Sequence, residues 1–168
     1  MAEMKVGDPT KRETQIGPLA RKDLMEHLAD QVDRSVKAGA RVVVGGHHRE
    51  KGFYYPPAML ADVRPGMAVF DEETFGPVAA VIRAADHHEL VRLANLSSFA
   101  LGASVWSSDV DRAHRLAARL DVGGVFINGP VKSDPRLPFG GTKNSGYGRE
   151  LSLLGIREFL NAKTVWIK

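Results

Sequence analysis

The chain has 168 residues, a length that fits one ordinary domain, and its content of 43% hydrophobic and 26% charged residues is typical of a globular protein. It has no run of 18 apolar residues and no signal-like N-terminus, so we expect a cytoplasmic protein without a membrane partner. It has no cysteine, which excludes disulfides and a thiolate nucleophile within these residues. Its 23 basic and 20 acidic residues are interspersed along the chain, which argues against nucleic-acid binding.

The first predicted elements are a helix and two extended segments. Four apolar residues recur at steps of four over residues 21–38 and form one helical stripe: Leu24, Leu28, Val32 and Val36. Gly39 then ends the helix in the usual place for a C-terminal glycine. The apolar run Arg41–Val44 is predicted to be a buried strand because two glycines follow it. Residues 53–60 contain two prolines and are therefore expected at a sheet edge or a bulge.

The middle of the chain alternates strands with helices. Three strands are predicted, at residues 78–82, 101–106 and 124–127. Each helix between them starts with a pair at capping spacing, Asp86 with Glu89 and Ser108 with Asp111. The apolar faces are Leu90, Leu93 and Ala94 in the first helix, and Val110, Ala113, Leu116, Ala117 and Leu120 in the second. This β-α-β-α-β order predicts an α/β fold with a parallel sheet and right-handed crossovers.

The last part of the chain is predicted to hold a long loop, a helix and a strand. The loop covers residues 128–148 and is rich in glycine and proline, and such a length is unusual unless it is functional. The helix lies near residues 150–160, and the strand at residues 164–167 closes the chain.

Two features of the sequence suggest a metal site and a phosphate-binding loop, but the spacing of their residues argues against both. The adjacent histidines of His47-His48 and His87-His88 diverge on a strand or a helix, so we predict no metal site. The glycine-rich segment 140–148 superficially resembles a phosphate-binding loop, but Lys143 follows Thr142 rather than glycine. We therefore interpret it as a tight turn that lets the backbone pass close to something.

The acidic segment at residues 71–77, Asp-Glu-Glu-Thr-Phe-Gly-Pro, allows two interpretations. A carboxylate there can accept hydrogen bonds from a ribose diol while the aromatic ring packs on a planar base. Alternatively, the acids occupy the first turn of a helix, where solvent and the helix dipole stabilise them.

The sequence resembles the aldehyde dehydrogenase superfamily in the motifs VGDP…IGPLA at 6–20, EETFGPV at 72–78 and PFGGTKNSGYGREL at 138–151. The resemblance covers essentially the whole chain, in the family's order and spacing. GFYYPPAMLADV at 52–63 and GGVFINGPVKSDPRLPFGG at 123–141 resemble the bacterial NAD(P)-dependent succinate-semialdehyde dehydrogenases. The resemblance implies a three-layer α/β fold with a parallel-rich sheet. Residues 1–160 would be the C-terminal part of the catalytic domain, and residues 161–168 a strand that joins a neighbouring subunit in a homo-oligomer.

The same resemblance implies roles for particular residues. Glu73 matches the glutamate that binds the nicotinamide ribose, and Phe75 the phenylalanine that contacts the nicotinamide of NAD or NADP. Phe139 matches the residue that lines the aldehyde tunnel, and Ser133 the serine that holds the substrate carboxylate. Glu150 matches a glutamate assigned to proton transfer beneath the active site. Arg136 either offers a bidentate fork to that carboxylate or is an exposed loop charge.

What the family needs before VGDP is absent from this sequence. The nucleophilic cysteine, the general-base glutamate, the oxyanion-hole asparagine and the dinucleotide-binding Rossmann domain all precede that motif in the family. We therefore expect a C-terminal part of an aldehyde dehydrogenase, inactive by itself, in which the choice between NAD and NADP is made elsewhere. The alternative is a catalytically silent α/β oligomerisation module, and a third possibility, motivated by the pI near 9.3, is a polyanion binder.

Overall fold

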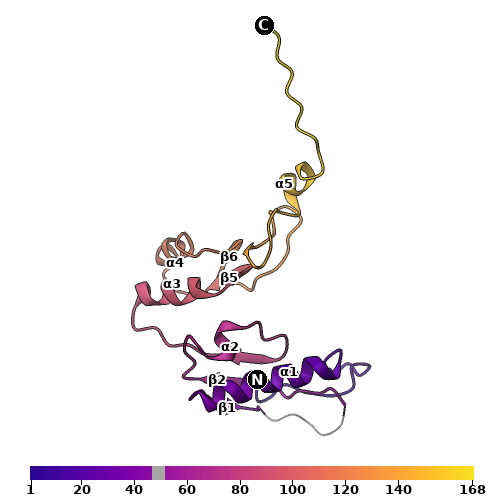
Figure 1. Cartoon of the computed structure of the whole chain (residues 1–168), viewed down its shortest axis with the longest axis vertical. Helices are drawn as coiled ribbons and strands as arrows, with labels where there is room; N and C mark the ends of the chain where they lie inside the picture. Colours follow the sequence, from indigo (N-terminus) through magenta and orange to yellow (C-terminus); the bar gives the residue numbers. More distant parts are fainter. Residues whose placement is uncertain (47–51) are drawn as a thin grey trace. The chain divides into compact units, whose positions relative to one another are not determined.

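The computed structural model describes residues 1–46 and 52–168, which form two compact units, Met1–Ala84 and Ala85–Lys168 (Figure 1). His47 and His48 lie outside the described residues. No helix in the described part of the chain combines the length and the apolar character needed to cross a membrane.

The first unit is built on the helix α1 (Lys22–Lys37), which confirms the predicted helix. Its buried face consists of Met25, Leu28, Gln31, Val32 and Ser35. The predicted stripe is right at Leu28 and Val32, whereas Leu24 is half-buried and Val36 is exposed. With 3.6 residues per turn, steps of four drift by about 40° each, so the two ends of such a stripe leave the buried face.

Gly39 ends α1 as predicted. At a φ of +106° its N–H donates to the carbonyl of Val36, and the N–H of Ala40 donates to the carbonyl of Ser35, each at 2.9 Å. These two bonds satisfy carbonyls of the last turn, and the positive φ is strained for any residue with a side chain.

A three-stranded sheet lies beside α1, in the order β1 (Arg41–Val44), β2 (Ala58–Ala61), β3 (Val78–Ala80). β1 pairs with β2 antiparallel, with a register shift between Val42 and Val44, and β2 pairs with β3 parallel. The predicted burial of β1 is wrong, because β1 is an exposed edge strand, with Val43 48% exposed. The segment with the prolines does not lie at an edge, because it leads into the central strand β2, which begins only after Pro57; the register shift in the pairing of β2 with β1 agrees with the predicted bulge.

The core of the first unit joins α1 to the segment that runs from Tyr55 through β2 to the short helix α2 (Ala68–Asp71). Its members are Met25, Leu28, Val32, Ala40, Tyr55, Ala58, Leu60, Val63, Met67 and Val69. Burial of these apolar side chains is the main term that stabilises the unit.

The second unit contains seven helices and strands among the described residues: α3 (His87–Leu96), β4 (Phe99–Ala100), β5 (Gly102–Val105), α4 (Val110–Ala117), β6 (Gly124–Ile127), β7 (Thr142–Lys143) and α5 (Ser152–Arg157). β5 and β6 pair in parallel from Gly102–Gly124 to Val105–Ile127, with α4 between them. β4 and β7 pair antiparallel. Helices that alternate with parallel-paired strands confirm the α/β class.

The predicted N-terminal capping residue is correct for α3 and wrong by one position for α4. Asp86 Oδ1 accepts a 2.8 Å hydrogen bond from the Glu89 N–H, as predicted for α3. In α4 the capping residue is Asp109, whose carboxylate accepts from the Arg112 N–H at 2.8 Å, and not Ser108. Serine and aspartate are both good capping residues, so the sequence alone does not distinguish Ser108 from the adjacent Asp109 as the cap.

The predicted β-α-β-α-β sheet forms only in its second half. β3 ends at Ala80 and belongs to the sheet of the first unit, while β5 and β6 pair in the second unit. Consecutive strands pair in many folds but not in all, because element order does not specify partners. Residues 161–168 are exposed and form no strand within the single chain, so their pairing with another subunit stays a prediction.

Candidate functional site

Glu72 follows the last turn of α2 and is tied to α1. Its carboxylate accepts hydrogen bonds from Arg34 Nη1 at 2.8 Å and Nη2 at 2.9 Å, and from Gln31 Nε2 at 3.0 Å. The hydrogen bonds from Arg34, followed by the one from Gln31, lower the pKa of Glu72 to about 2. Glu72 is therefore ionised and held in place by two side chains of one helix.

Glu73, one residue further on, is held by its backbone instead. Its carbonyl accepts a 3.1 Å hydrogen bond from Gln31 Nε2, while its side chain is exposed and has no hydrogen-bond partner or ion pair among the described residues. The ring of Phe75 is 71% exposed. An anchored backbone thus presents a free carboxylate and a free aromatic face two residues apart.

This geometry bears on the helix-dipole interpretation of the acidic segment. Glu72 caps the C-terminal end of α2, so neither glutamate lies in the first turn of a helix. The helix-dipole interpretation is wrong for Glu72 and Glu73, because carboxylates at that end gain nothing from the dipole. A ribose diol over Glu73 with a planar base on Phe75 remains compatible with the site.

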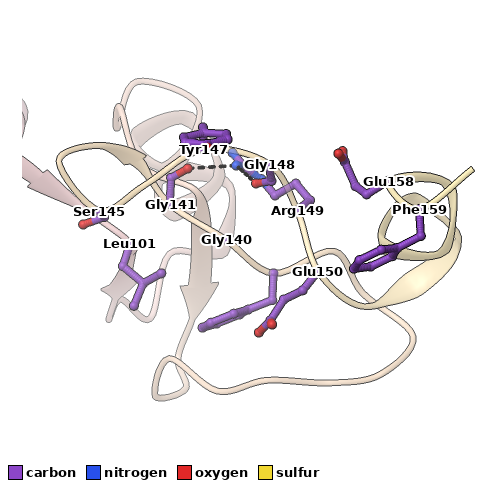
Figure 2. A pocket seen from close by; sticks show the side chains of 11 residues that line it. Leu101, Gly140, Gly141, Ser145, Tyr147, Gly148, Arg149, Glu150, Glu158 and Phe159 are labelled. Carbon is purple, nitrogen blue, oxygen red and sulfur yellow. Dashed lines mark hydrogen bonds between the residues drawn. The ribbon is translucent and has the colours of Figure 1, made fainter.

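In the second unit, Phe139 and Glu150 lie side by side. The Phe139 N–H donates to the Glu150 carbonyl at 2.9 Å, and the Glu150 N–H donates to the Phe139 carbonyl at 2.8 Å. Both residues line an open hollow of about 410 Å³, whose other walls include Leu101, Tyr147, Arg149 and Phe159 (Figure 2). The structure therefore brings together the predicted tunnel residue and the predicted proton-transfer residue.

Ser133 and Arg136 precede Phe139 on the same loop, but they are not among the residues that line this hollow. Ser133 is exposed. The Arg136 side chain is 85% exposed, and its fork donates to Asp134 from Nε at 2.9 Å and from Nη2 at 2.7 Å. These bonds lower the pKa of Asp134 to about 2. The arginine fork predicted for a substrate carboxylate is thus engaged with a carboxylate of its own loop.

The glycine-rich segment 140–148 is held in place by two basic side chains that had no predicted role. Lys143 Nζ donates to the carbonyls of Asn95 at 2.8 Å and Ser97 at 3.2 Å. Arg149 Nη1 donates to the carbonyls of Gly141 at 2.8 Å and Gly148 at 2.6 Å, as Figure 2 shows. The segment is a tight turn, as predicted, and Lys143 within it and Arg149 just after it donate the hydrogen bonds that hold it.

Close backbone approach explains the glycines at the mouth of this turn. A Cβ on Gly123 would lie 1.6 Å from the carbonyl oxygen of Gly140, and a Cβ on Gly141 would lie 2.5 Å from the Cβ of Ser145. No side chain fits at either place, so the loop that carries Phe139 packs directly on the start of β6.

Glu73 and Phe75 belong to the first unit, whereas Ser133, Arg136, Phe139 and Glu150 belong to the second.

Gln31 was not identified from the sequence. The feature that could have indicated it is its position as a polar side chain next to Val32, within the apolar face of a helix. Among the described residues, no cluster of three or more histidine, aspartate or glutamate side chains is arranged to hold a metal ion.

Comparison with known proteins places these residues in a wider context. A model of the aldehyde dehydrogenase family matches residues 1–165. The chain is 49% identical over 166 residues to the Escherichia coli K12 protein named succinate semialdehyde dehydrogenase [NAD(P)+] Sad, a match that covers 98% of the chain and 36% of that protein. It is 48% identical over 168 residues to succinate-semialdehyde dehydrogenase [NADP(+)] 1 of Mycobacterium tuberculosis H37Rv, covering 99% of the chain and 37% of that protein.

A solved structure agrees with these relatives. The succinic semialdehyde dehydrogenase of Streptococcus pyogenes, crystallised with NADP+, superposes with a TM-score of 0.92 at 36% identity, over 98% of this chain and 36% of that one. The chain thus spans a little over a third of the length of the proteins that it matches.

Proposed function

The chain belongs to the aldehyde dehydrogenase family, and from this premise we propose that it supplies part of the active site of an NAD(P)-dependent enzyme that oxidises succinate semialdehyde to the carboxylate. The names of the E. coli and M. tuberculosis relatives support the cofactor and the substrate. The observation that carries the proposal is the anchored segment that leaves the Glu73 carboxylate and the Phe75 ring free.

On the cofactor side, Glu73 accepts hydrogen bonds from the hydroxyls of the nicotinamide ribose, and Phe75 packs against the nicotinamide. When bound, NAD(P)+ supplies the hydride acceptor. Two or three hydrogen bonds of about 1 kcal/mol each do not by themselves overcome the cost of association, so these contacts orient the reactive end and do not provide tight binding.

On the substrate side, Phe139 lines the aldehyde path and Glu150 beside it moves protons. Ser133 donates a hydrogen bond to the distal carboxylate of the substrate. Arg136 binds the same carboxylate when the substrate displaces Asp134 from its guanidinium group. Because the Arg136 side chain is 85% exposed, a ligand can reach that group. The thiol that attacks the aldehyde is not a residue of this chain, which has no cysteine, so we expect the isolated chain to be inactive.

An enzyme in which this chain replaces the matching segment of the E. coli relative tests the proposal. We expect the hybrid to reduce NAD+ or NADP+ with succinate semialdehyde. Ser133→Ala should raise the KM for succinate semialdehyde about five- to thirtyfold, because a hydrogen bond to a charged group is lost. For an uncharged aldehyde of similar length the same variant should change KM less than twofold.

The uncharged aldehyde is the internal control for damage to the fold. If Ser133→Ala raises both KM values equally, the serine does not recognise the carboxylate. If the hybrid carrying the unaltered chain folds and shows no turnover, the proposed activity is wrong, and the alternative of a catalytically silent α/β oligomerisation module is favoured. The exposed apolar residues near the C-terminus, among them Val165 and Ile167, are the observation behind that alternative.

A further inference from the structure

Two residues of α1, the buried Gln31 and the exposed Arg34, hold the glutamate pair. Gln31 is completely buried, and its Nε2 donates both to the Glu72 carboxylate at 3.0 Å and to the Glu73 carbonyl at 3.1 Å. Arg34, one turn further along, donates to both carboxylate oxygens of Glu72. Three of these four hydrogen bonds fix the side chain of Glu72, and the fourth fixes the backbone of Glu73.

Packing holds the far end of the same segment. A Cβ on Gly76 would lie 2.5 Å from Leu28 Cδ2, so the backbone there rests directly on the buried face of α1. The residues from Glu72 to Gly76 are therefore attached to α1 at both ends, while Glu73 and Phe75 between them keep exposed side chains.

Stability alone does not explain a glutamine at position 31. Its Oε1 is buried and has no hydrogen-bond partner among the described residues, which costs free energy. An apolar side chain of similar volume would fill the site without that cost, and Arg34 by itself would still hold Glu72. What an apolar residue cannot supply is the second hydrogen bond, the one to the backbone of Glu73.

We propose that Gln31 and Arg34 are positioning residues that hold Glu73 ready for the hydroxyls of the nicotinamide ribose. The inference rests on the proposed function of Glu73. Arg34 neutralises and anchors Glu72, and Gln31 sets the position of the next residue through its carbonyl. A carboxylate on a fixed backbone loses less conformational freedom on binding than one on a free loop, so preorganisation increases affinity.

The test is a titration of the whole 168-residue chain with β-nicotinamide mononucleotide, followed by the amide resonances of residues 73–75 in NMR spectra. We expect weak binding, with a Kd of about 1–10 mM, because few contacts are available. Glu73→Gln should weaken it about tenfold through loss of the acceptor, and Gln31→Met about fivefold through loss of position. Arg34→Lys, which keeps the charge without the fork, should weaken it about twofold.

Ser35→Ala is the matched control. Ser35 is equally buried on the same helix face, but its hydroxyl donates to the Gln31 carbonyl and accepts from the Val69 N–H, away from Glu73. It should lower the melting temperature at least as much as Gln31→Met, because the buried Val69 N–H loses its acceptor, and leave the Kd unchanged. A role in stability alone would make the Kd follow the melting temperature in both variants.

The outcomes separate the two ideas. If Glu73→Gln weakens binding but Gln31→Met and Arg34→Lys do not, the positioning role is overturned and the cofactor role of Glu73 stands. If Ser35→Ala weakens binding as much as Gln31→Met, the positioning role is also overturned. If the unaltered chain shows no shift at residues 73–75, the cofactor role itself is wrong, and the inference fails with it.

Discussion

Glu72 and Glu73 have the same chemistry and adjacent positions, yet their surroundings give them different tasks. Glu72 has three hydrogen bonds from α1 and a pKa of about 2, whereas the Glu73 side chain is left exposed. Arg136 shows the same effect, since Asp134 occupies its fork. At the scale of single residues, tertiary contacts decide which charges are available to a ligand.

The lowered pKa of Glu72 predicts how stability depends on pH. In the unfolded chain a glutamate has a pKa of about 4.3, so between that value and about 2 the unfolded state binds more protons than the folded state. The contribution of Glu72 to stability is therefore present above pH 4.3 and is lost as the pH falls toward 2.

Urea unfolding at a series of pH values checks this prediction. Between pH 5 and pH 3 the unfolding midpoint of the unaltered chain should fall more steeply than that of Glu72→Gln. Glu3→Gln, which removes an exposed carboxylate of the same unit, should leave the slope unchanged. Parallel curves for the unaltered chain and Glu72→Gln would show that the pair with Arg34 contributes nothing measurable, as is common for exposed ion pairs.

At the scale of elements, α3 depends on a residue far along the chain. The helix ends at Leu96 with Ser97 as its C-cap and no glycine there to close it. Instead Lys143 of β7 donates to the carbonyls of Asn95 and Ser97, and its Nζ lies 3.4 Å from Asp121 Oδ2. One lysine thus closes the helix and fixes the loop that leads back to Phe139.

We expect Lys143→Met to lower the free energy of unfolding by about 1–2 kcal/mol, because two carbonyls lose a charged donor. Methionine keeps most of the apolar stem, so the loss reports on the ammonium group. Lys132→Met, at an exposed lysine of the same unit, is the control and should change stability by less than about 0.5 kcal/mol. Chemical denaturation of both variants gives the comparison, and equal midpoints would mean that Lys143 does not cap α3.

At the scale of the whole molecule, each unit leaves apolar surface uncovered. In the first unit, β1 is an edge strand with exposed valines. In the second unit, Phe159 and Ile167 follow α5 in the chain, and each is 91% exposed. Exposed strand edges and large apolar residues are typical sites of association with another chain.

We therefore expect the isolated chain to self-associate, with an average mass that rises with concentration in light scattering. Ile167→Lys should lower that mass, because a charge on the last residues opposes strand addition. Lys163→Ile, a change of opposite sense just before residues 164–167, should not lower it. A monomer at every concentration, with one cooperative melting transition, would contradict the expectation.

Signals carried by residues within a few positions of one another were read correctly from the sequence. These include the capping box of Asp86, the terminating Gly39, the strand Gly124–Ile127 and the motifs that identify the family. The capping box and the terminating glycine each depend on a hydrogen bond or a backbone conformation that the local residues themselves create. The strand shows itself in sequence as a short apolar run, although its hydrogen bonds go to β5.

The tertiary structure decided what depends on residues far apart in the chain. In the folded chain β3 belongs to the first sheet and β1 is an exposed edge strand. Arg34 pairs with the carboxylate of Glu72 rather than with that of Glu73. Gln31 and Glu73 are 42 positions apart, and Lys143 and Asn95 are 48 apart. Residue types and spacing state which hydrogen bonds each side chain can make, but only the packed fold brings particular partners within reach, and so the free carboxylate was visible only there.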